Sequence, residues 1–372
     1  MPRTSLPDDD TKLSPFSIST HTYKVTDGHE ILADVLIPKK LLELGSDSEE
    51  WKKGRPVMVR FHGGWLVGGH RGFPTYIPLW LYSSGYHNNA IIVAPDYRLL
   101  PEATVVELLD DLDDFWKWLG TEFPSVVREQ SRIASGSDKE LEVDLDRVVV
   151  QGESAGGYCA VQVALSHFKP PTSGTPQNTP HIRALVAIYP MLDFRASHWS
   201  EAYEKHIMGN PQYPESIIDD HLKAIKASAT KPVLSAAPLG PGAPRNSLPY
   251  AYIQHGRFLE LLGPERDPSP GNRIIHAEDR ILDGAKLPPA LFVQGTEDSG
   301  VPVGGTDNFI SLLREHDAIV RPEGLTDSKD WDSLMYARVP GEHGFDSNIG
   351  PNDTAWAKDG LDFIEKIWLE LD

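Results

Sequence analysis

One ten-residue segment constrains the fold more than any other part of this chain. Residues 148–157 read Val-Val-Val-Gln-Gly-Glu-Ser-Ala-Gly-Gly, a β-branched run that enters a Gly-x-Ser-x-Gly pattern and then apolar residues at helical spacing. So tight a strand-to-helix turn needs small residues on both sides of the serine, which Gly152 and Gly156 supply, and it exposes the serine hydroxyl above a sheet. The pattern alone also fits a plain glycine-rich helix start, but the flanking strand and helix favour a nucleophilic Ser154.

Strands and helices alternate along the rest of the chain. Residues 21–38 alternate about Asp27-Gly28 as a β-hairpin does. Apolar, β-branched runs typical of buried parallel strands occupy residues 56–61, 90–94, 147–151 and 182–189, and strand character returns at 289–294 and 333–339. Helical patterns occupy residues 102–119, 305–316 and 352–371. The sequence therefore predicts an α/β fold with a mostly parallel, doubly wound sheet.

The stretch from residue 194 to residue 285 interrupts this alternation. It is rich in Pro, His, Tyr and Trp and has weak periodicity. We expect an inserted cap or lid, over a core made of residues 1–193 and 286–372 in which residues 1–16 form a polar tail. Several cap aromatics fit either a pocket wall or plain cap core, so none is assigned: Trp199, Tyr203, Tyr213, Tyr250, Tyr252 and Phe258.

A serine hydroxyl needs an imidazole to take its proton and a carboxylate to orient that imidazole. In hydrolases built on this turn, the acid and then the histidine follow the serine along the chain. Asp298 follows the first of the two late strands and His343 follows the second, so both would lie at the carboxyl edge of the sheet. Among the rival acids, Glu297 would point elsewhere and Asp283 precedes the strand.

Backbone donors for a developing oxyanion are predicted at two places. Residues 62–65, His-Gly-Gly-Trp, end the first buried strand with a glycine pair, Gly63 and Gly64. The Ala155 amide lies at the start of the helix after Ser154, where N–H groups favour negative charge. An ordinary glycine turn is the alternative interpretation of residues 62–65, and their combination with Ser154 favours an oxyanion hole.

Together these motifs resemble the hormone-sensitive-lipase-like branch of α/β-hydrolase esterases, over residues 56–345 apart from the cap. Beside the serine and glycine motifs, the matching blocks are Ala-Pro-Asp-Tyr-Arg-Leu-Leu-Pro-Glu at 94–102, Tyr-Pro-Met-Leu-Asp at 189–193 and His-Gly-Phe at 343–345. The resemblance implies an α/β-hydrolase fold. It also implies a catalytic triad of Ser154, Asp298 and His343. The oxyanion hole that it implies is formed by Gly63, Gly64 and Ala155.

Trp65 departs from the family pattern, because the family has a third glycine at this position. Its indole would narrow the pocket, and whether its N–H is an oxyanion donor stays open. Asp96 and Arg98, in the block at 94–102, are expected to pair and brace the oxyanion loop. The long separation of Asp298 from His343 is ascribed to a loop at residues 322–332.

Composition limits the partners. Asp plus Glu number 54 against 35 for Lys plus Arg, and the net charge of −19 repels phosphate backbones and anionic lipid, so neither nucleic acid nor membrane is expected. The single cysteine, Cys159, excludes an intramolecular disulfide and a multi-cysteine metal site, and it is predicted to be a small buried residue. With no apolar run of spanning length and no signal-peptide pattern, a cytoplasmic location is expected. The oligomeric state is open, with a homodimer as one possibility.

The leading functional hypothesis is hydrolysis of a small or medium hydrophobic carboxylic ester through an acyl-enzyme on Ser154, without cofactor or metal. A second is an acyltransferase, lactone-forming or condensing enzyme of natural-product biosynthesis, whose pocket excludes water. A third is a non-catalytic ligand receptor on the same fold, as the plant gibberellin receptors show by resemblance. The presence of His343 in its motif argues against the receptor.

Overall fold

One eight-stranded sheet forms the centre of the computed structural model, which describes residues 2–44, 48–136, 140–170, 179–240, 242–321 and 332–370. The strands are ordered β1-β2-β4-β3-β5-β6-β7-β8. Their bounds are β1 (Phe16–Thr26), β2 (His29–Pro38), β3 (Arg55–Phe61), β4 (Ile91–Pro95), β5 (Val143–Glu153), β6 (Ile182–Ile188), β7 (Ala290–Gly295) and β8 (Leu334–Val339). The β1-β2 and β2-β4 pairs are antiparallel and the other pairs are parallel. The predicted mostly parallel sheet is confirmed.

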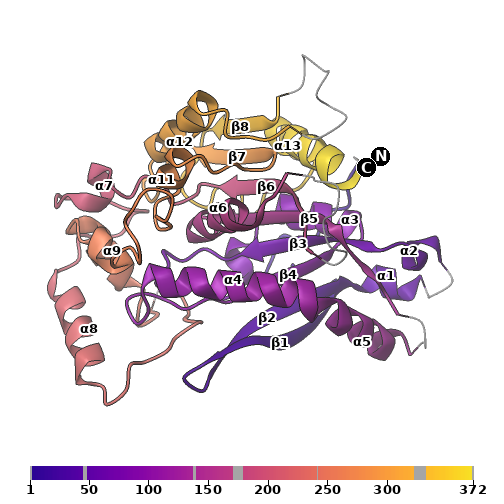
Figure 1. Cartoon of the computed structure of the whole chain (residues 1–372), viewed down its shortest axis with the longest axis horizontal. Coiled ribbons are helices and arrows are strands. Elements are labelled where there is room, and N and C mark those ends of the chain that lie inside the picture. The colour runs from indigo at the N-terminus through magenta and orange to yellow at the C-terminus, as the bar shows by residue number, and fades with distance from the viewer. Residues whose placement is uncertain are drawn as a thin grey trace.

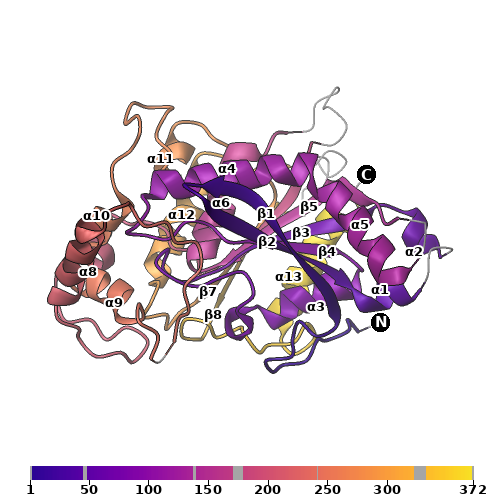
Figure 2. The ribbon, with the colours of Figure 1, turned by 90° about the horizontal axis from the view of Figure 1, so that it is seen from below.

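Both faces of the sheet are covered because successive strand residues point to opposite sides. Val57, Val59 and Phe61 of β3 join one buried cluster, whereas Met58 joins another. Helices α4 (Val105–Thr121), α6 (Ala155–His167) and α12 (Val303–Glu315) pack on the first cluster, and α3 (Leu79–His87) and α13 (Ala355–Glu365) pack on the second. Figure 2 shows α4 and α6 on one side of the sheet and α3 and α13 on the other. The doubly wound arrangement is therefore confirmed.

Helix α4 begins at Val105, three residues after the start of the predicted segment 102–119. The Thr104 side chain accepts a hydrogen bond from the Glu107 backbone N–H, and the Glu107 carboxylate accepts one from the Thr104 backbone N–H at 2.8 Å. This capping box satisfies N–H groups that the first helical turn leaves free and so fixes the start of the helix. The remaining short elements of the core are α1 (Lys39–Glu43), α2 (Glu49–Lys52), η1 (Pro74–Tyr76), α5 (Phe123–Ser135) and η2 (Lys366–Glu370).

The N-terminal residues, predicted as a polar tail, pack against the core. Leu6 and Lys12 are buried, and Lys12 Nζ donates to the Ser347 carbonyl at 2.7 Å. Arg3 forms ion pairs with Asp362 and Glu365 at the end of the chain. Ion pairs and burial therefore place the start of the chain beside its last helix.

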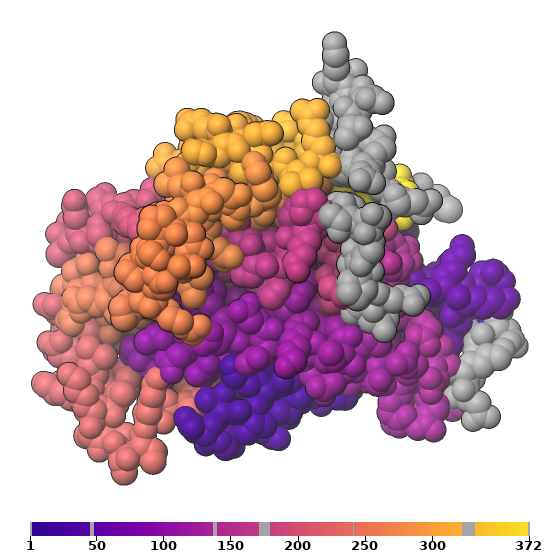
Figure 3. All heavy atoms as spheres, in the orientation of Figure 1, coloured from indigo at the N-terminus to yellow at the C-terminus, as the bar shows by residue number. Residues whose placement is uncertain are grey.

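In the segment predicted as a cap, the described residues (194–240 and 242–285) form five helices and none of the named strands. They are α7 (Ser197–Ser200), α8 (Ser216–Ala227), α9 (Ser247–Gln254), α10 (Phe258–Leu262) and α11 (Ala277–Leu282). Figure 1 shows α7, α8 and α9 gathered at the end of the sheet away from both chain termini, and Figure 3 shows this segment lying directly against the core. Its identity as a separate cap, residues 194–285, stays a prediction. Most of the loop at residues 322–332, to which the long separation of Asp298 from His343 is ascribed, lies outside the described residues.

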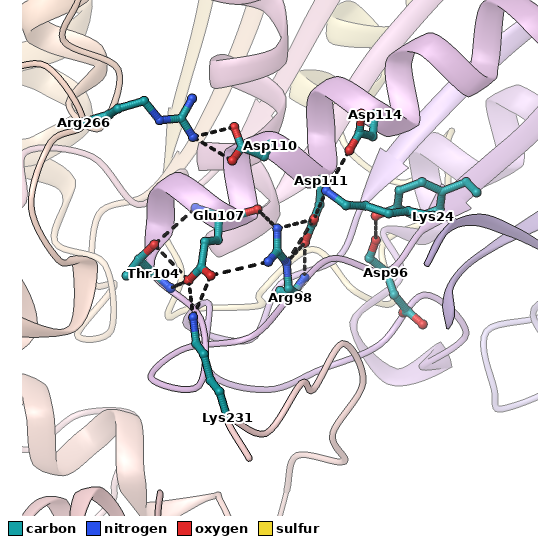
Figure 4. Close-up of polar contacts among 11 residues, drawn as sticks. Lys24, Asp96, Arg98, Thr104, Glu107, Asp110, Asp111, Asp114, Lys231 and Arg266 are labelled. Carbon is teal, nitrogen blue, oxygen red and sulfur yellow. Dashed lines mark hydrogen bonds and ion pairs between the residues drawn. The ribbon is translucent and has the colours of Figure 1, made fainter. Parts of the chain in front are cut away.

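A network of charges lies along α4 (Figure 4). Asp111 is fully buried and accepts hydrogen bonds from the Arg98 backbone and guanidinium, and its Oδ1 lies 2.7 Å from Lys24 Nζ. Two further ion pairs join α4 to the segment 194–285: Lys231 with Glu107 and Arg266 with Asp110. The helix thus connects the β1 edge, the core and the predicted cap. Within the described part of the chain no helix is long and apolar enough to cross a membrane.

We expect Asp111→Ala to destabilise the protein strongly. The substitution leaves the guanidinium of Arg98 and the ammonium of Lys24 without their buried partner, and breaking such a pair costs about 3–5 kcal/mol. Urea unfolding followed by circular dichroism measures this. Asp114→Ala is the matched control, because Asp114 pairs with the same Lys24 but its side chain is 50% exposed, and it should cost less than about 1 kcal/mol. Equal losses in the two variants would contradict the expectation.

Candidate active site

The turn between β5 and α6 holds Ser154 in a strained conformation. Ser154 has φ 58° and ψ −119°, a backbone region that residues with side chains rarely adopt. A Cβ added to Gly152 would lie 2.0 Å from the Gly156 carbonyl oxygen, and one added to Gly156 would lie 2.0 Å from the Phe61 carbonyl oxygen. The backbone of Ser154 is also held by the end of β6, since its N–H donates to the Ile188 carbonyl at 2.9 Å. Glycine is therefore required on both sides of the serine.

Ser154, His343 and Asp298 form one chain of hydrogen bonds. His343 Nε2 lies 3.0 Å from Ser154 Oγ, and His343 Nδ1 lies 2.9 Å from Asp298 Oδ2. The backbone N–H groups of Gly300 and Val301 donate to the other Asp298 oxygen at 2.9 and 2.7 Å. The structure thus brings the three predicted catalytic side chains together.

The two rival acids lie elsewhere. Glu297 is exposed to solvent. Asp283 forms an ion pair with Arg273 at 2.6 Å. Both observations agree with the sequence argument for Asp298, whose side chain is fully buried against His343.

Two aromatic rings enclose the His343 imidazole. The Trp65 indole is nearly parallel to it at 5.6 Å between ring centroids, and the Tyr189 ring lies 4.5 Å away on a tilted plane. Burial opposes protonation of His343, but the charge and hydrogen bond of Asp298 outweigh it and raise the pKa above its ordinary 6.5. An imidazole whose conjugate acid is stabilised in this way is a stronger base toward the Ser154 hydroxyl.

Of the predicted oxyanion donors, Gly63 already has an acceptor. Its N–H donates to Glu153 Oε1 at 3.2 Å, and the Glu153 carboxylate also forms a buried ion pair with Arg60. This hydrogen bond argues against Gly63 as a donor to an oxyanion. The N–H groups of Gly64 and Ala155, the other two predicted donors, and that of Trp65 have no acceptor among the described residues.

The expected pairing of Asp96 with Arg98 is wrong. Arg98 turns toward α4 and binds Asp111, whereas the Asp96 carboxylate binds the guanidinium of Arg71 and accepts its backbone N–H at 2.7 Å. Asp96 still braces the loop that carries Gly63 and Gly64, but through Arg71. Tyr97 supports the same loop, since its hydroxyl donates to the His62 carbonyl at 2.5 Å.

A pocket opens above Ser154. Its walls are mainly apolar and aromatic, and they come from the glycine loop, η1, the triad loops and the segment 194–285: Gly63, Gly64, Trp65, Tyr76, Glu153, Ser154, Tyr189, Met208, Leu239, Asn246, Tyr250, His343 and Gly344. Among the unassigned cap aromatics, Tyr250 lines this pocket, whereas Trp199 and Phe258 are buried behind it. Sequence reasoning missed Tyr76, Met208, Leu239 and Asn246, because no motif or periodicity marks them.

Two further sequence predictions concern reactive or metal-binding groups. Cys159 is buried, as predicted, and burial raises the pKa of its thiol. In the described ranges, no group of three or more His, Cys, Asp or Glu side chains is arranged to hold a metal ion.

Comparison with known proteins gives consistent similarities. Residues 58–262 match the model of a family described as alpha/beta hydrolase fold. The chain is 28% identical over 361 residues to the probable carboxylesterase M8 of a Phoma species, covering 96% of this chain and 98% of the relative. It is 30% identical over 233 residues to the probable carboxylesterase clz11 of Cochliobolus lunatus, covering 60% of this chain and 93% of the relative.

Two other similarities differ in kind. A non-reducing polyketide synthase, ascC of Acremonium egyptiacum, is 25% identical over 365 residues, which is 94% of this chain but 15% of the synthase. Esterase B of Lactobacillus rhamnosis superposes with a TM-score of 0.55 at 15% identity, covering 95% of this chain and 86% of the esterase. At that identity the superposition establishes a shared fold.

The reactivity of Ser154 toward a fluorophosphonate should rise with pH through the pKa of His343. Only the neutral imidazole can take the hydroxyl proton. Because Asp298 raises the pKa of His343, the half-maximal labelling rate is expected above pH 6.5. Labelling rates from pH 5 to pH 9, followed by mass spectrometry, give the midpoint.

Asp298→Asn serves as the comparison for this titration. Without the carboxylate charge, the midpoint should fall and the maximal rate should drop at least about a hundredfold. A midpoint that is the same in the two proteins would contradict the role assigned to Asp298.

Proposed function

The chain belongs to the alpha/beta hydrolase fold family, and from that membership and the geometry of its site we propose that it is a serine hydrolase of carboxylic esters. The observation that carries the proposal is the unbroken hydrogen-bond chain from Ser154 Oγ through His343 to Asp298, at 3.0 and 2.9 Å. Similarity to two probable carboxylesterases supports the same reaction.

In the first half of the reaction, Ser154 Oγ attacks the ester carbonyl carbon while His343 Nε2 takes the hydroxyl proton. Asp298 holds the imidazole with Nδ1 protonated and stabilises the imidazolium that forms. The carbonyl oxygen becomes an oxyanion, which the N–H groups of Gly64 and Ala155 are proposed to bind, with Trp65 as a further candidate. Each such donor lowers the activation barrier by about 3 kcal/mol in comparable enzymes.

The imidazolium then gives its proton to the departing alcohol, and an acyl group remains on Ser154. Water enters, His343 removes a proton from it, and a second tetrahedral intermediate collapses to the free acid. The same groups act in both halves, and no step needs a cofactor or a metal ion.

The proposed substrate is a small or medium hydrophobic ester. Trp65, Tyr250, Met208 and Leu239 give the pocket an apolar wall close to Ser154. The Trp65 indole occupies space that stays open when glycine is at this position, as in the esterase family that the motif resembles. Its ring centroid lies 5.6 Å from that of His343 and 5.8 Å from that of Tyr250. A cytoplasmic location and a homodimer stay predictions.

Acyl transfer is the second candidate. Its support is the match of 94% of this chain to a segment of a polyketide synthase, and further synthases of that class show similar identities. The same acyl-enzyme on Ser154 would then be attacked by an alcohol instead of water. A ligand receptor without catalysis is disfavoured, because His343 lies within hydrogen-bond distance of Ser154.

Hydrolysis of p-nitrophenyl esters from acetate to palmitate tests the proposal. We expect a preference for short acyl chains, and a loss of at least about a thousandfold in kcat for Ser154→Ala. Full activity in Ser154→Ala would contradict the assigned nucleophile. Product analysis with an added alcohol separates the two candidates: free acid indicates hydrolysis, and a new ester as the main product indicates transfer.

Trp65→Gly should widen the range of acyl groups. The backbone of Trp65 has φ 63°, which glycine adopts readily, so the loop can keep its shape while the indole is removed. The ratio of kcat/KM for octanoate to that for acetate should rise about tenfold, an effect typical of pocket changes of this kind. Trp116→Phe is the control, because Trp116 stacks on His167 outside the pocket. An unchanged ratio in Trp65→Gly would show that the indole does not limit the acyl site.

A further inference from the structure

The loop that carries the proposed oxyanion donors has an unusual backbone. This oxyanion loop, residues 63–71, has positive φ at Gly64, Trp65, Leu66 and Gly69. Trp65 and Leu66 carry side chains, and each such residue costs about 1–2 kcal/mol in this region. A loop of this kind keeps its shape when surrounding contacts hold it.

From the core, Asp96 holds Arg71 at one end of the oxyanion loop and Glu153 holds Gly63 at the other. The middle of the loop is held by the segment 194–285. Gly69 N–H donates to the Ala237 carbonyl at 2.7 Å, and Ala237 N–H donates back to the Gly69 carbonyl at 3.0 Å. The centre of the loop therefore depends on a part of the chain that lies far away in the sequence.

Leu239 packs directly on the glycines of the oxyanion loop. A Cβ on Gly68 would lie 2.5 Å from Leu239 Cδ2, and one on Gly64 would lie 2.9 Å from Leu239 Cδ1. The Leu239 side chain therefore leaves no room for a larger residue at Gly64 or Gly68 and fills the space on this side of the loop.

Arg245 links the segment 194–285 to the oxyanion loop through a charged side chain. Its Nε donates to the Val67 carbonyl at 2.9 Å and its Nη2 donates to the Leu100 carbonyl at 2.6 Å. The same guanidinium binds both oxygens of Glu102, at 2.5 and 2.8 Å. The Arg245 side chain is 12% exposed and that of Glu102 is 7% exposed, so the pair is largely shielded from solvent.

Glu102 is ionised in its pair with Arg245. Burial opposes ionisation of Glu102, but hydrogen bonds from His221 and Arg245 outweigh it and lower its pKa to about 2. A guanidinium is a planar fork with fixed donor directions, so Glu102 on one side sets where the Val67 carbonyl lies on the other. Leu100 adds to this arrangement, because its N–H donates to the Leu66 carbonyl at 2.8 Å.

We propose that Arg245 is a positioning residue for the oxyanion hole: by joining Glu102 to the Val67 carbonyl, it fixes the loop so that the N–H groups of Gly64 and Trp65 face the reacting carbonyl. The inference rests on the proposed function. The segment 194–285 then builds part of the catalytic machinery, in addition to lining the pocket. Arg245 touches no reacting atom, and it acts through residues 64–67.

Arg245→Lys tests this role while keeping the positive charge beside Glu102. A lysine cannot donate to Val67, Leu100 and both Glu102 oxygens at once. We expect kcat on the best p-nitrophenyl ester to fall about 10- to 100-fold with KM nearly unchanged, because oxyanion stabilisation acts on the transition state. Melting temperature and circular dichroism are recorded for each variant.

The inhibition constant of a transition-state analogue distinguishes positioning of the oxyanion hole from a merely structural role, because a structural role would leave it unchanged. In a trifluoromethyl ketone, Ser154 Oγ bonds to the carbonyl carbon, His343 takes the proton and the carbonyl oxygen becomes the oxyanion. In Arg245→Lys the inhibition constant of the trifluoromethyl ketone should rise by the same factor as kcat falls. The inhibition constant of the matching methyl ketone should stay the same. Arg245→Ala is the second variant, and adding ethylguanidinium should recover part of its kcat.

Arg266→Ala and Lys231→Ala are the matched controls. Each removes an ion pair between the segment 194–285 and α4, as Figure 4 shows, without touching the oxyanion loop. The inference is overturned if Arg245→Lys keeps wild-type kcat, if the two ketones weaken equally, or if the controls lose as much kcat. It is distinct from the proposed function, which fails if the wild-type protein neither hydrolyses esters nor reacts with a fluorophosphonate.

Discussion

The whole site depends on the tight turn at Ser154, which joins β5 to α6. The backbone of residues 152–156 passes so close to its neighbours that a methyl group at Gly152 or Gly156 would overlap a carbonyl oxygen. This close approach places the Ser154 hydroxyl at the carboxyl edge of the sheet. Because β7 and β8 run parallel to β5, the loops after them bring Asp298 and His343 to the same edge.

The oxyanion side of the site is held together by charge. Two buried acids, Glu153 and Asp96, hold the ends of the oxyanion loop, each paired with an arginine. A third acid, Glu102, acts on its middle through Arg245. Buried charges of this kind are costly unless they are paired and hydrogen-bonded, and each of these three acids has an arginine partner.

Much of the fold and all three residues of the triad could be predicted from the sequence, because parallel strands and tight turns impose strong local patterns. Asp298 and His343 could be identified from the sequence because each lies in the loop that follows a predicted strand. The role of Gly63 could not be predicted: its N–H is taken by Glu153, and a pattern of residue types does not reveal where a side chain turns. The partner of Arg98 was missed for the same reason. The pocket residues of the segment 194–285 lie in stretches where the sequence shows no hydrophobic periodicity that would mark them.

The reciprocal backbone bridge between Gly69 and Ala237 has an evolutionary consequence. It joins the loop after β3 to the segment 194–285, which follows β6, so two segments that are far apart in the sequence are held together in the fold. Substitutions in residues 194–285 are compatible with the present shape of the oxyanion loop only if they preserve this contact. A chimera that exchanged residues 194–285 alone between relatives would combine two contact surfaces that do not match, whereas exchanging both segments together would keep the contact intact.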